Sequence, residues 1–315
     1  MLDATGFRLL NSWQRGFPLV PRPFAEIAAA CGIDEDDVLS RFGQLRQRGL
    51  IDRIGPVFRP NTAGASTLAA MAVPPERLQA VARQVSGHAG VNHNYERENR
   101  CNLWFVATAP SAAALQWTLA CVEHETGLPV LRLPLLEEFH IDLGFDLENH
   151  SVPREPQREP ATPLSEPERR LAARVAAGLP LETRPFAAFG LPEGELIGTL
   201  GRWLACGVVR RIGAVVRHRR LGYDANAMVV WDLPDADAGA AGRRLAADAA
   251  VTLCYRRARA LPEWPYNLYC MVHGRERAHV LHEVNRLSAQ HGLDAFPRAV
   301  LFSTRCFGQR AARYG

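Results

Sequence analysis

The stretch Val91–Ala107 reads Val-Asn-His-Asn-Tyr-Glu-Arg-Glu-Asn-Arg-Cys-Asn-Leu-Trp-Phe-Val-Ala. It opens with an imidazole, a phenol and two guanidinium groups, and it continues as an apolar run typical of a buried strand. The same order of residue types returns in Val251–His273, where Tyr255-Arg256-Arg257 precedes a second run that ends in Met271-Val272-His273. The chain therefore presents the same polar-then-apolar element twice.

A second pair of matching segments extends this duplication toward the N-terminus of each half. Gly49–Arg59 aligns with Gly207–Arg217, and Gly55 corresponds to Gly213, an offset of 158 residues. Ahead of each segment, apolar residues at helical spacing predict short helices, which is the order of a winged helix-turn-helix. Helices are expected at 7–15, 24–30 and 35–47 before a strand at 50–58, and at 166–177, 186–189 and 193–205 before a strand at 208–216.

A βαββαβ unit of the ferredoxin-like kind follows each of these segments. In the first half the pattern predicts strands at 68–73, 91–96, 102–108 and 130–137 with helices at 75–85 and 112–125, and the second half shows the same order over 225–302. The expected fold is α+β, a tandem repeat of the two units. The expected boundaries are winged helix-turn-helix domains at 1–60 and 168–218, ferredoxin-like domains at 61–150 and 219–315, and a stiff proline-rich linker at 151–167.

Composition narrows the class of protein. The 315 residues are 47% hydrophobic and 22% charged, with a formal net charge of +4, which suits an ordinary globular protein and is too small for one that coats nucleic acid. No signal peptide, membrane-spanning run or glycine-rich phosphate loop is found, so a cytoplasmic protein without a nucleotide cofactor is expected. Seven scattered cysteines, and only His279 and His282 at helical spacing, predict neither disulfides nor a metal site.

A winged helix-turn-helix followed by a ferredoxin-like unit resembles the Lrp/AsnC family of feast-famine regulators, and the motifs are closer to an enzymatic branch, the sirohaem (siroheme) decarboxylases. The first half resembles the NirD subunit of that family and the second half resembles NirL. The segments that carry the resemblance are His93–Arg97, Asn102–Phe105 and Leu136–Phe145 for NirD, and Cys254–Arg257, Trp264–Leu268, Met271–Arg275 and Leu301–Arg305 for NirL.

The resemblance implies a fused NirDL-type protein of haem d1 biosynthesis in denitrification. Such proteins remove carbon dioxide from the acetate side chains on rings C and D of sirohaem and give didecarboxysirohaem. The implied cofactor list is empty apart from the iron that arrives with the substrate. The implied partners are sirohaem, the other half of the chain through its sheet, and related decarboxylase subunits, with a homodimer as a further possibility.

Loss of carbon dioxide leaves carbanion character that must be protonated, and histidine suits that task near neutral pH. His93, Tyr95 and Arg97 share one side of an alternating strand. The second half offers Tyr255 and Arg257, but in the alignment of the two halves Leu253 corresponds to His93. The histidine of the second half is instead His273, which corresponds to Thr108 in the first half. We therefore hypothesise two unlike pockets, one for each acetate arm.

Carboxylate-rich substrates favour arginine clamps, because guanidinium groups pair carboxylates in bidentate fashion. The candidate clamps are repeated in the two halves as Arg53 and Arg59, and Arg211 and Arg217. Three further motif residues are candidates for substrate binding: Asn102, Trp104 and Asn267.

Two other functions fit the same pattern. A transcriptional regulator would need a basic recognition helix, but the helix at 35–47 is preceded by Asp34 and opens with Glu35-Asp36-Asp37, so DNA binding is not expected. A non-catalytic tetrapyrrole carrier would use the same apolar wall and clamps, and turnover is what distinguishes it. His140 and the tail Arg305–Tyr314 belong to family motifs without an assigned chemistry.

Overall fold

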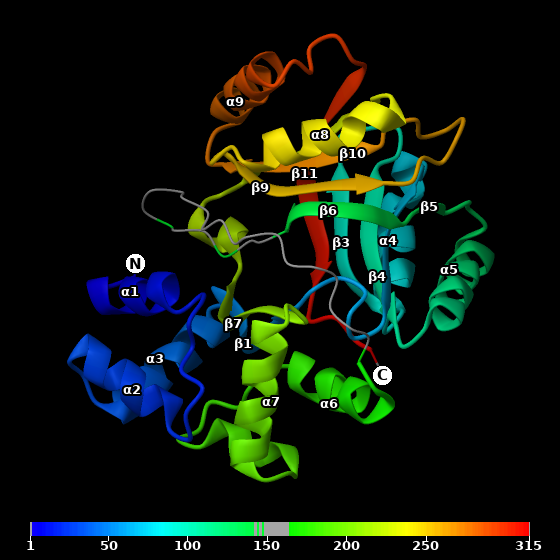
Figure 1. Cartoon of the computed structure of the whole chain (residues 1–315). Helices are drawn as coiled ribbons and strands as arrows, with labels where there is room; N and C mark the ends of the chain where they lie inside the picture. Colours follow the sequence, from blue (N-terminus) through cyan, green and yellow to red (C-terminus); the bar gives the residue numbers. More distant parts are fainter. Residues whose placement is uncertain (1, 142–143, 145–146, 148–163, 315) are drawn as a thin grey trace. The chain divides into compact units, whose positions relative to one another are not determined.

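The computed structural model describes residues 2–141, 144, 147 and 164–314 (Figure 1). The described residues fall into two compact units, and each unit draws on both halves of the sequence. The helix-turn-helix unit holds residues 2–63, 164–221 and 314, and the sheet unit holds the described residues of 64–147 together with 222–313. The helix-turn-helix segments of the two halves therefore belong to one unit, and the ferredoxin-like segments of the two halves belong to the other.

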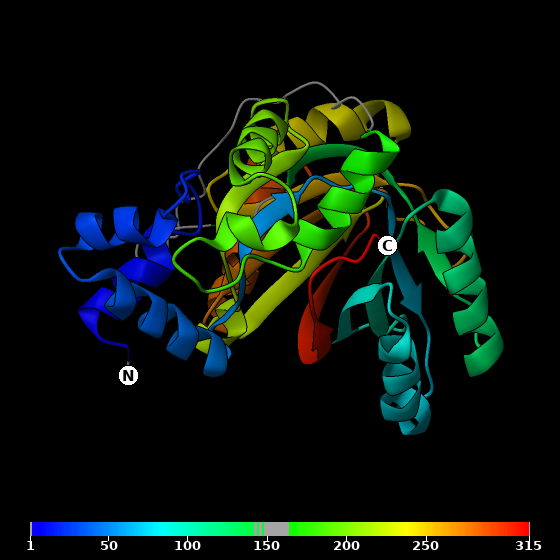
Figure 2. The same cartoon turned by 90° about the horizontal axis from the view of Figure 1, so that it is seen from below.

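The helix-turn-helix unit contains one helical cluster from each half, seen as blue and green groups in Figures 1 and 2. The first half contributes α1 (Ala4–Ser12), α2 (Pro23–Cys31), α3 (Glu35–Gln47) and β1 (Ile51–Phe58). The second half contributes α6 (Glu166–Ala176), the 3₁₀ turn η2 (Pro185–Phe189), α7 (Glu193–Ala205), β7 (Val209–Val216) and η3 (His218–Leu221). These bounds lie within a few residues of those expected from the sequence.

Strands β1 and β7 pair with each other as a two-stranded antiparallel sheet, with Gly55 directly opposite Gly213. These two glycines are also the matching residues of the repeat, so a pseudo-twofold axis passes between them. Each half was expected to carry its own wing strand, and the structure joins the two strands instead. A Cβ on Gly213 would lie 2.4 Å from the carbonyl oxygens of Trp13 and Gln14, so glycine is required for this close approach.

The predicted linker, 151–167, extends too far at its C-terminal end. Residues 151–163 lie outside the described part of the chain, but Leu164 is buried and α6 begins at Glu166. The Ser165 amide donates to the Glu168 carboxylate at 2.9 Å, which is half of a capping box, and Pro167 lies in the first turn where its missing N–H costs nothing.

The sheet unit contains, among its described residues, a nine-stranded antiparallel sheet with helices on one face. Its first-half elements are β2 (Ala65–Met71), η1 (Pro75–Arg77), α4 (Leu78–Gly87), β3 (Val91–Arg97), β4 (Leu103–Ala109), α5 (Ala112–Thr126), β5 (Leu131–Leu133) and β6 (Leu135–Ile141). Its second-half elements are β8 (Ala225–Trp231), α8 (Asp235–Ala246), β9 (Val251–Arg257), β10 (Leu268–Gly274), α9 (Arg277–Gln290) and β11 (Arg298–Gln309).

The strand order β5-β2-β4-β3-β11-β8-β10-β9-β6 shows that the halves exchange their last strands. The prediction of a single strand at 130–137 is wrong, because this segment splits at Pro134 into β5 and β6. β5 pairs with β2 of the same half, and β6 pairs with β9 of the other half. Strand β11 runs beyond the expected end at 302 and pairs with both β8 and β3 (Figure 1). Pro134 has no N–H to donate to a neighbouring strand, which accounts for the break between β5 and β6.

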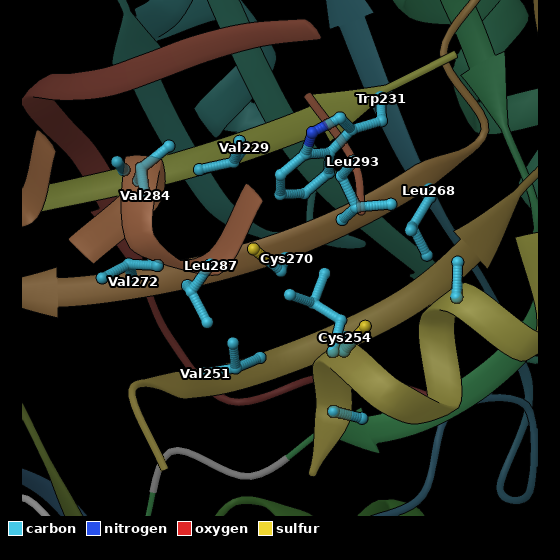
Figure 3. Packing of buried hydrophobic residues seen from close by; sticks show 14 of the residues in the cluster. Val229, Trp231, Val251, Cys254, Leu268, Cys270, Val272, Val284, Leu287 and Leu293 are labelled. Atoms are coloured by element: carbon cyan, nitrogen blue, oxygen red, sulfur yellow. The ribbon is translucent and has the colours of Figure 1, made fainter. Parts of the chain in front are cut away.

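Helices cover one face of this sheet and bury two apolar clusters. One cluster lies under α4 and α5 and the other under α8 and α9, where Trp231, Leu268 and Val284 are fully buried (Figure 3). Burying each such large side chain stabilises the fold by about 1.5–3 kcal/mol. Within the described residues no helix is long and apolar enough to cross a membrane.

The opposite face, which we call the helix-free face, carries a third cluster that includes Leu68, Met228 and Tyr269. Trp104 on β4 meets Trp264, in the loop after β9, with ring centroids 4.9 Å apart. Three strands separate β4 from β10 in the sheet order, so this contact shows that the sheet curls over its helix-free face. Side chains from both halves thereby share one surface.

Candidate functional site

The side chains of β3 form a polar row on the helix-free face. Asn94 points to the other face, where its Nδ2 donates to the Ala82 carbonyl oxygen of α4 at 3.0 Å, so His93, Tyr95 and Arg97 alternate away from the helices. The rings of His93 and Tyr95 stack with an interplanar angle of 12° and centroids 6.3 Å apart. The Arg97 guanidinium carbon lies 5.9 Å from the Tyr95 ring centroid. The structure thus brings this predicted triplet together as one row.

Arg97 links this row to the second half of the chain. Its Nη1 donates to the Leu301 carbonyl oxygen of β11 at 3.2 Å, and its Nη2 lies 3.9 Å from the Met271 sulfur of β10. Only 9% of Arg97 is exposed, so this charge is held inside the sheet unit next to the second half. One residue of the first motif therefore belongs to the surroundings of the second.

His273 on β10 is the residue whose chemistry this environment changes. Its Nδ1 lies 2.7 Å from the Thr252 hydroxyl, which in turn donates to the Met271 carbonyl oxygen at 3.1 Å. Burial, and to a lesser extent the nearby positive charge of Arg97, together lower the pKa of His273 to about 4. His273 is consequently a neutral imidazole near pH 7.

The contact of Thr252 with His273 could not be predicted from the sequence, because it depends on a β-bulge in β9. Leu253 pairs with Met271 and Val251 with Val272, so Thr252 is the extra residue on β9. Asn92 is the extra residue at the corresponding place on β3, between the pairs Val91–Ala107 and His93–Val106. A bulge depends on how two strands register, and strict alternation along the sequence does not show it.

Tyr255 and Arg257 form the second-half counterpart of Tyr95 and Arg97. The Arg257 guanidinium carbon lies 4.5 Å from the Tyr255 ring centroid, and Tyr255 stacks on Tyr269 with centroids 5.5 Å apart. Arg257 Nη1 donates to the Leu133 carbonyl oxygen at 2.7 Å, which ties β9 to the first half. Tyr255 is 6% exposed, so this pair is more deeply packed than the row on β3.

The candidate arginine clamps lie in the helix-turn-helix unit, where they interact with other protein groups. Arg211 is 5% exposed and its Nη1 donates to the carbonyl oxygens of Gln14 and Ala214, so the structure explains it as a buried structural residue. Arg53 and Arg217 both bind the Asp52 carboxylate, at 2.9 and 2.7 Å. Arg59 follows β1 and its amide donates to Val208. The prediction that these four clamp the substrate stays a prediction; Arg211 also has a structural role, and Asp52 shares the charge of Arg53 and Arg217.

Three further candidates have structural explanations. Asn102 makes two hydrogen bonds with the backbone of Val73, at 2.9 and 3.0 Å, and Asn267 makes the corresponding pair with the backbone of Leu233, at 3.0 and 3.1 Å. Trp104 is 1% exposed and donates from Nε1 to the Cys101 carbonyl oxygen at 2.6 Å. These side chains hold the ends of strands and the core, and their part in substrate binding stays a prediction.

The candidate site therefore consists of the β3 row together with His273 and Thr252. It offers two imidazoles, a phenol and a guanidinium, which is an arrangement suited to binding an anion and moving a proton. Among the residues that the structure describes, no group of three or more His, Cys, Asp or Glu side chains is placed to hold a metal ion.

The depressed pKa of His273 makes a prediction about stability and pH. Between pH 6.5, the ordinary histidine value, and pH 4, the unfolded chain binds this proton and the folded chain does not. The stability of the protein should therefore fall as the pH falls through this window, by up to about 3 kcal/mol from this residue. Urea unfolding at a series of pH values should show that His273→Gln removes this component, while the exposed His279→Gln keeps it; equal slopes for both variants would contradict the assignment.

Comparisons with known proteins agree with this architecture. A family described as "AsnC-like ligand binding domain" matches residues 63–140 and 220–308, and a "Siroheme decarboxylase NirDL-like HTH domain" matches residues 7–51. The chain is 44% identical to the "Siroheme decarboxylase NirDL subunit" of Paracoccus denitrificans (strain Pd 1222), over 99% of this chain and 97% of that protein.

Two solved structures are similar over nearly the full length. A crystal structure of the siroheme decarboxylase NirDL has a TM-score of 0.69 and 30% identity, and covers 98% of this chain and 94% of that one. A structure of NirDL in co-complex with an iron-uroporphyrin III analogue has a TM-score of 0.67 and 29% identity, with coverage of 98% and 93%.

The paired helix-turn-helix segments and the AsnC-like sheet define an Lrp/AsnC-like protein. Similarity over almost the whole length narrows this class further. The chain belongs to the sirohaem decarboxylase family of the NirDL type.

Proposed function

We propose that this chain is a sirohaem decarboxylase, a carbon–carbon lyase that removes carbon dioxide from the acetate arms of sirohaem. The observation that carries the proposal is identity of 44% over 99% of the chain to a named siroheme decarboxylase subunit. A structure of similar fold contains an iron-uroporphyrin III analogue, which supports a tetrapyrrole ligand here. The arms on rings C and D, the product didecarboxysirohaem and the pathway to haem d1 are those implied by the family resemblance.

The reaction needs one proton and no oxidant. The bond between the acetate methylene and its carboxylate breaks, the electron pair stays on the methylene carbon and delocalises into the macrocycle, and carbon dioxide leaves. A proton then converts the methylene carbon into a methyl group. The protein's part is to hold the arm, exclude water and supply that proton.

We propose His93, rather than His273, as the proton donor. His273 is neutral near pH 7 because burial and Arg97 depress its pKa, so it is poorly suited to give a proton from the imidazolium form. We assign His273 the role of a neutral hydrogen-bonding group oriented by Thr252, at 2.7 Å. Arg97, which lies near the Tyr95 ring and contacts Met271, would supply the positive charge next to a substrate carboxylate.

The hypothesis of two unlike pockets stays a prediction, and Arg97 modifies it. Because its guanidinium contacts Met271 and influences the pKa of His273, the two histidine positions share one charged group. We propose that the two acetate arms are processed at neighbouring places on one face and that they interact through Arg97.

The proposal also covers the cofactor and the partners of the protein. The iron enters as part of the substrate, and related subunits are candidate partners. Helices α3 and α7 each begin with acidic side chains, Glu35, Asp36 and Asp37 in one and Glu193 and Glu195 in the other. Because DNA phosphates repel these groups, we propose that the helix-turn-helix segments serve the fold and do not bind DNA.

Anaerobic incubation of the purified protein with sirohaem, followed by mass spectrometry of the extracted tetrapyrrole, tests the activity. We expect the loss of two carboxyl groups as carbon dioxide. Unchanged sirohaem that co-elutes with the protein would contradict the decarboxylase and favour a carrier. Absence of binding would contradict both.

A further inference from the structure

The two places where the halves exchange strands are copies of each other. At the first junction β6 of the first half pairs with β9 of the second, and at the second junction β11 of the second half pairs with β3 of the first. Both junctions show two register irregularities at matching places. The first junction pairs Leu135, Glu137, Glu138 and His140 with Arg257, Arg256, Tyr255 and Cys254, and the second pairs Ser303, Arg305, Cys306 and Gly308 with Arg97, Glu96, Tyr95 and Asn94.

The charged pair at matching positions of the junctions is reversed. At the first junction the exchanged strand carries the acid, and Glu137 lies 3.6 Å from the Arg256 guanidinium. At the second junction the exchanged strand carries the base, and Arg305 lies 3.7 Å from the Glu96 carboxylate. Each junction is thus complementary only when an exchanged strand meets the opposite half.

A phenylalanine at the bulge of each exchanged strand adds a difference in shape. Phe139 packs on α8 over Gly242, where a Cβ would lie 2.0 Å from the ring. Phe307 occupies the matching bulge and packs against the cluster that contains Ala82 of α4. Gly242 and Ala82 correspond, because Cys254 and Asn94, which occupy matching positions on β9 and β3, bond to their carbonyl oxygens.

We propose that these residues form a pairing code that makes the first half associate with the second half and disfavours two copies of the same half. Unlike halves bring Glu137 to Arg256, Arg305 to Glu96 and Phe139 to Gly242. The occupant of each exchange site is therefore the opposite half. This inference does not rest on the proposed enzymatic activity.

Each pairing of like halves meets its own obstacle. Two first halves would place Glu137 against Glu96, and Arg83, which corresponds to Arg243, would relieve part of that repulsion. Phe139 in its native position would meet the Cβ of Ala82, so its ring would have to shift to the position that Phe307 takes over α4. The obstacle here is therefore a weak repulsion together with this rearrangement. Two second halves would place Arg305 against Arg256 and Arg243, where Glu137 stands in the native junction at 3.6 and 3.2 Å, so the obstacle there is electrostatic.

The test uses the full chain with a protease site introduced within Ser151–Pro163. The cleaved protein is unfolded in urea and refolded as the equimolar mixture, and native mass spectrometry then counts the three possible pairs, since the fragments differ in mass. We expect pairs of unlike halves to dominate. A statistical mixture of like and unlike pairs would overturn the proposal.

A charge swap at one junction sharpens the test. The double variant Glu96→Arg with Arg305→Glu keeps both native junctions complementary, yet it gives each like pair an attractive contact. We expect pairs of two second halves to increase about tenfold. Adding Ala82→Gly should also release pairs of two first halves. No change in the distribution would overturn the code.

Swapping the charges at both junctions is the matched control. Arg243 also pairs with Glu137, at 3.2 Å, so its charge is reversed as well. Adding Glu137→Arg, Arg256→Glu and Arg243→Glu to the double variant keeps both native junctions complementary and restores like-charge contacts in both like pairs, so unlike pairs should dominate again. The intact chain gives a second measurement that needs no refolding of fragments. Arg305→Glu alone should lower the melting temperature, and Glu96→Arg should restore it in the double variant; additive effects without this rescue would overturn the pairing of these two residues.

Discussion

A His93→Ala variant is expected to lose about a hundredfold to ten-thousandfold in the rate of sirohaem decarboxylation, the range for a positioned proton donor. The ring stacks on Tyr95 at the open end of the β3 row and lies on the helix-free face. Sirohaem binding should persist, because apolar contacts and Arg97 remain. Single-turnover assays with mass spectrometry of the products measure the rate, and the absorption spectrum of the bound tetrapyrrole reports binding.

His279→Ala is the control for this experiment, since His279 is exposed on α9 and should leave turnover unchanged. A His93→Ala variant with turnover within about threefold of the parent would contradict the assignment of His93 as the donor. Accumulation of a mono-decarboxylated product in either the His93→Ala or the His273→Ala variant would support unlike handling of the two arms. Equal and complete loss in both variants, with no such product, would count against it.

A Trp104→Ala variant is expected to lower the free energy of unfolding by about 3–5 kcal/mol, the cost of emptying a large aromatic site in a core. Trp104 is 1% exposed, it packs edge-on against Trp264 at 4.9 Å, and its indole donates to the Cys101 carbonyl oxygen. Truncation leaves both a cavity and an unpaired buried carbonyl. Urea unfolding, monitored by circular dichroism and not by tryptophan fluorescence, measures the effect.

Trp117→Ala is the matched control, because Trp117 on α5 is 73% exposed. Its effect should stay within about 0.5 kcal/mol. A small effect for Trp104→Ala, together with a large loss of sirohaem affinity in a folded Trp104→Phe variant, would make Trp104 a substrate-binding residue and contradict the structural role assigned above.

Most helices and strands were predictable because their signals are local. The periodicity of Val38, Phe42 and Leu45 defined α3, and the structure buries these three side chains. The apolar run after Asn102 defined β4. The errors arose where local signals conflict, as at Pro134, where one apolar run is divided between two halves of the sheet.

The candidate site was predictable only in part. Alternation along β3 correctly grouped His93, Tyr95 and Arg97 on one face. The motif also drew attention to Asn102 and Asn267, whose recurrence has a structural cause, since each holds the backbone that follows β2 or β8, the matching strands of the two halves. A repeated residue can thus preserve a fold as readily as a function.

The sequence by itself determined the duplication, the type and order of the elements and the family to which the chain belongs, because repeats, periodicity and motifs are written along the chain. Only the tertiary structure decided that β6 and β11 cross between halves, that Thr252 reaches His273 through a bulge, and that burial, with the charge of Arg97, depresses the pKa of His273. These features depend on strand register and on burial, and both arise only when distant segments pack together.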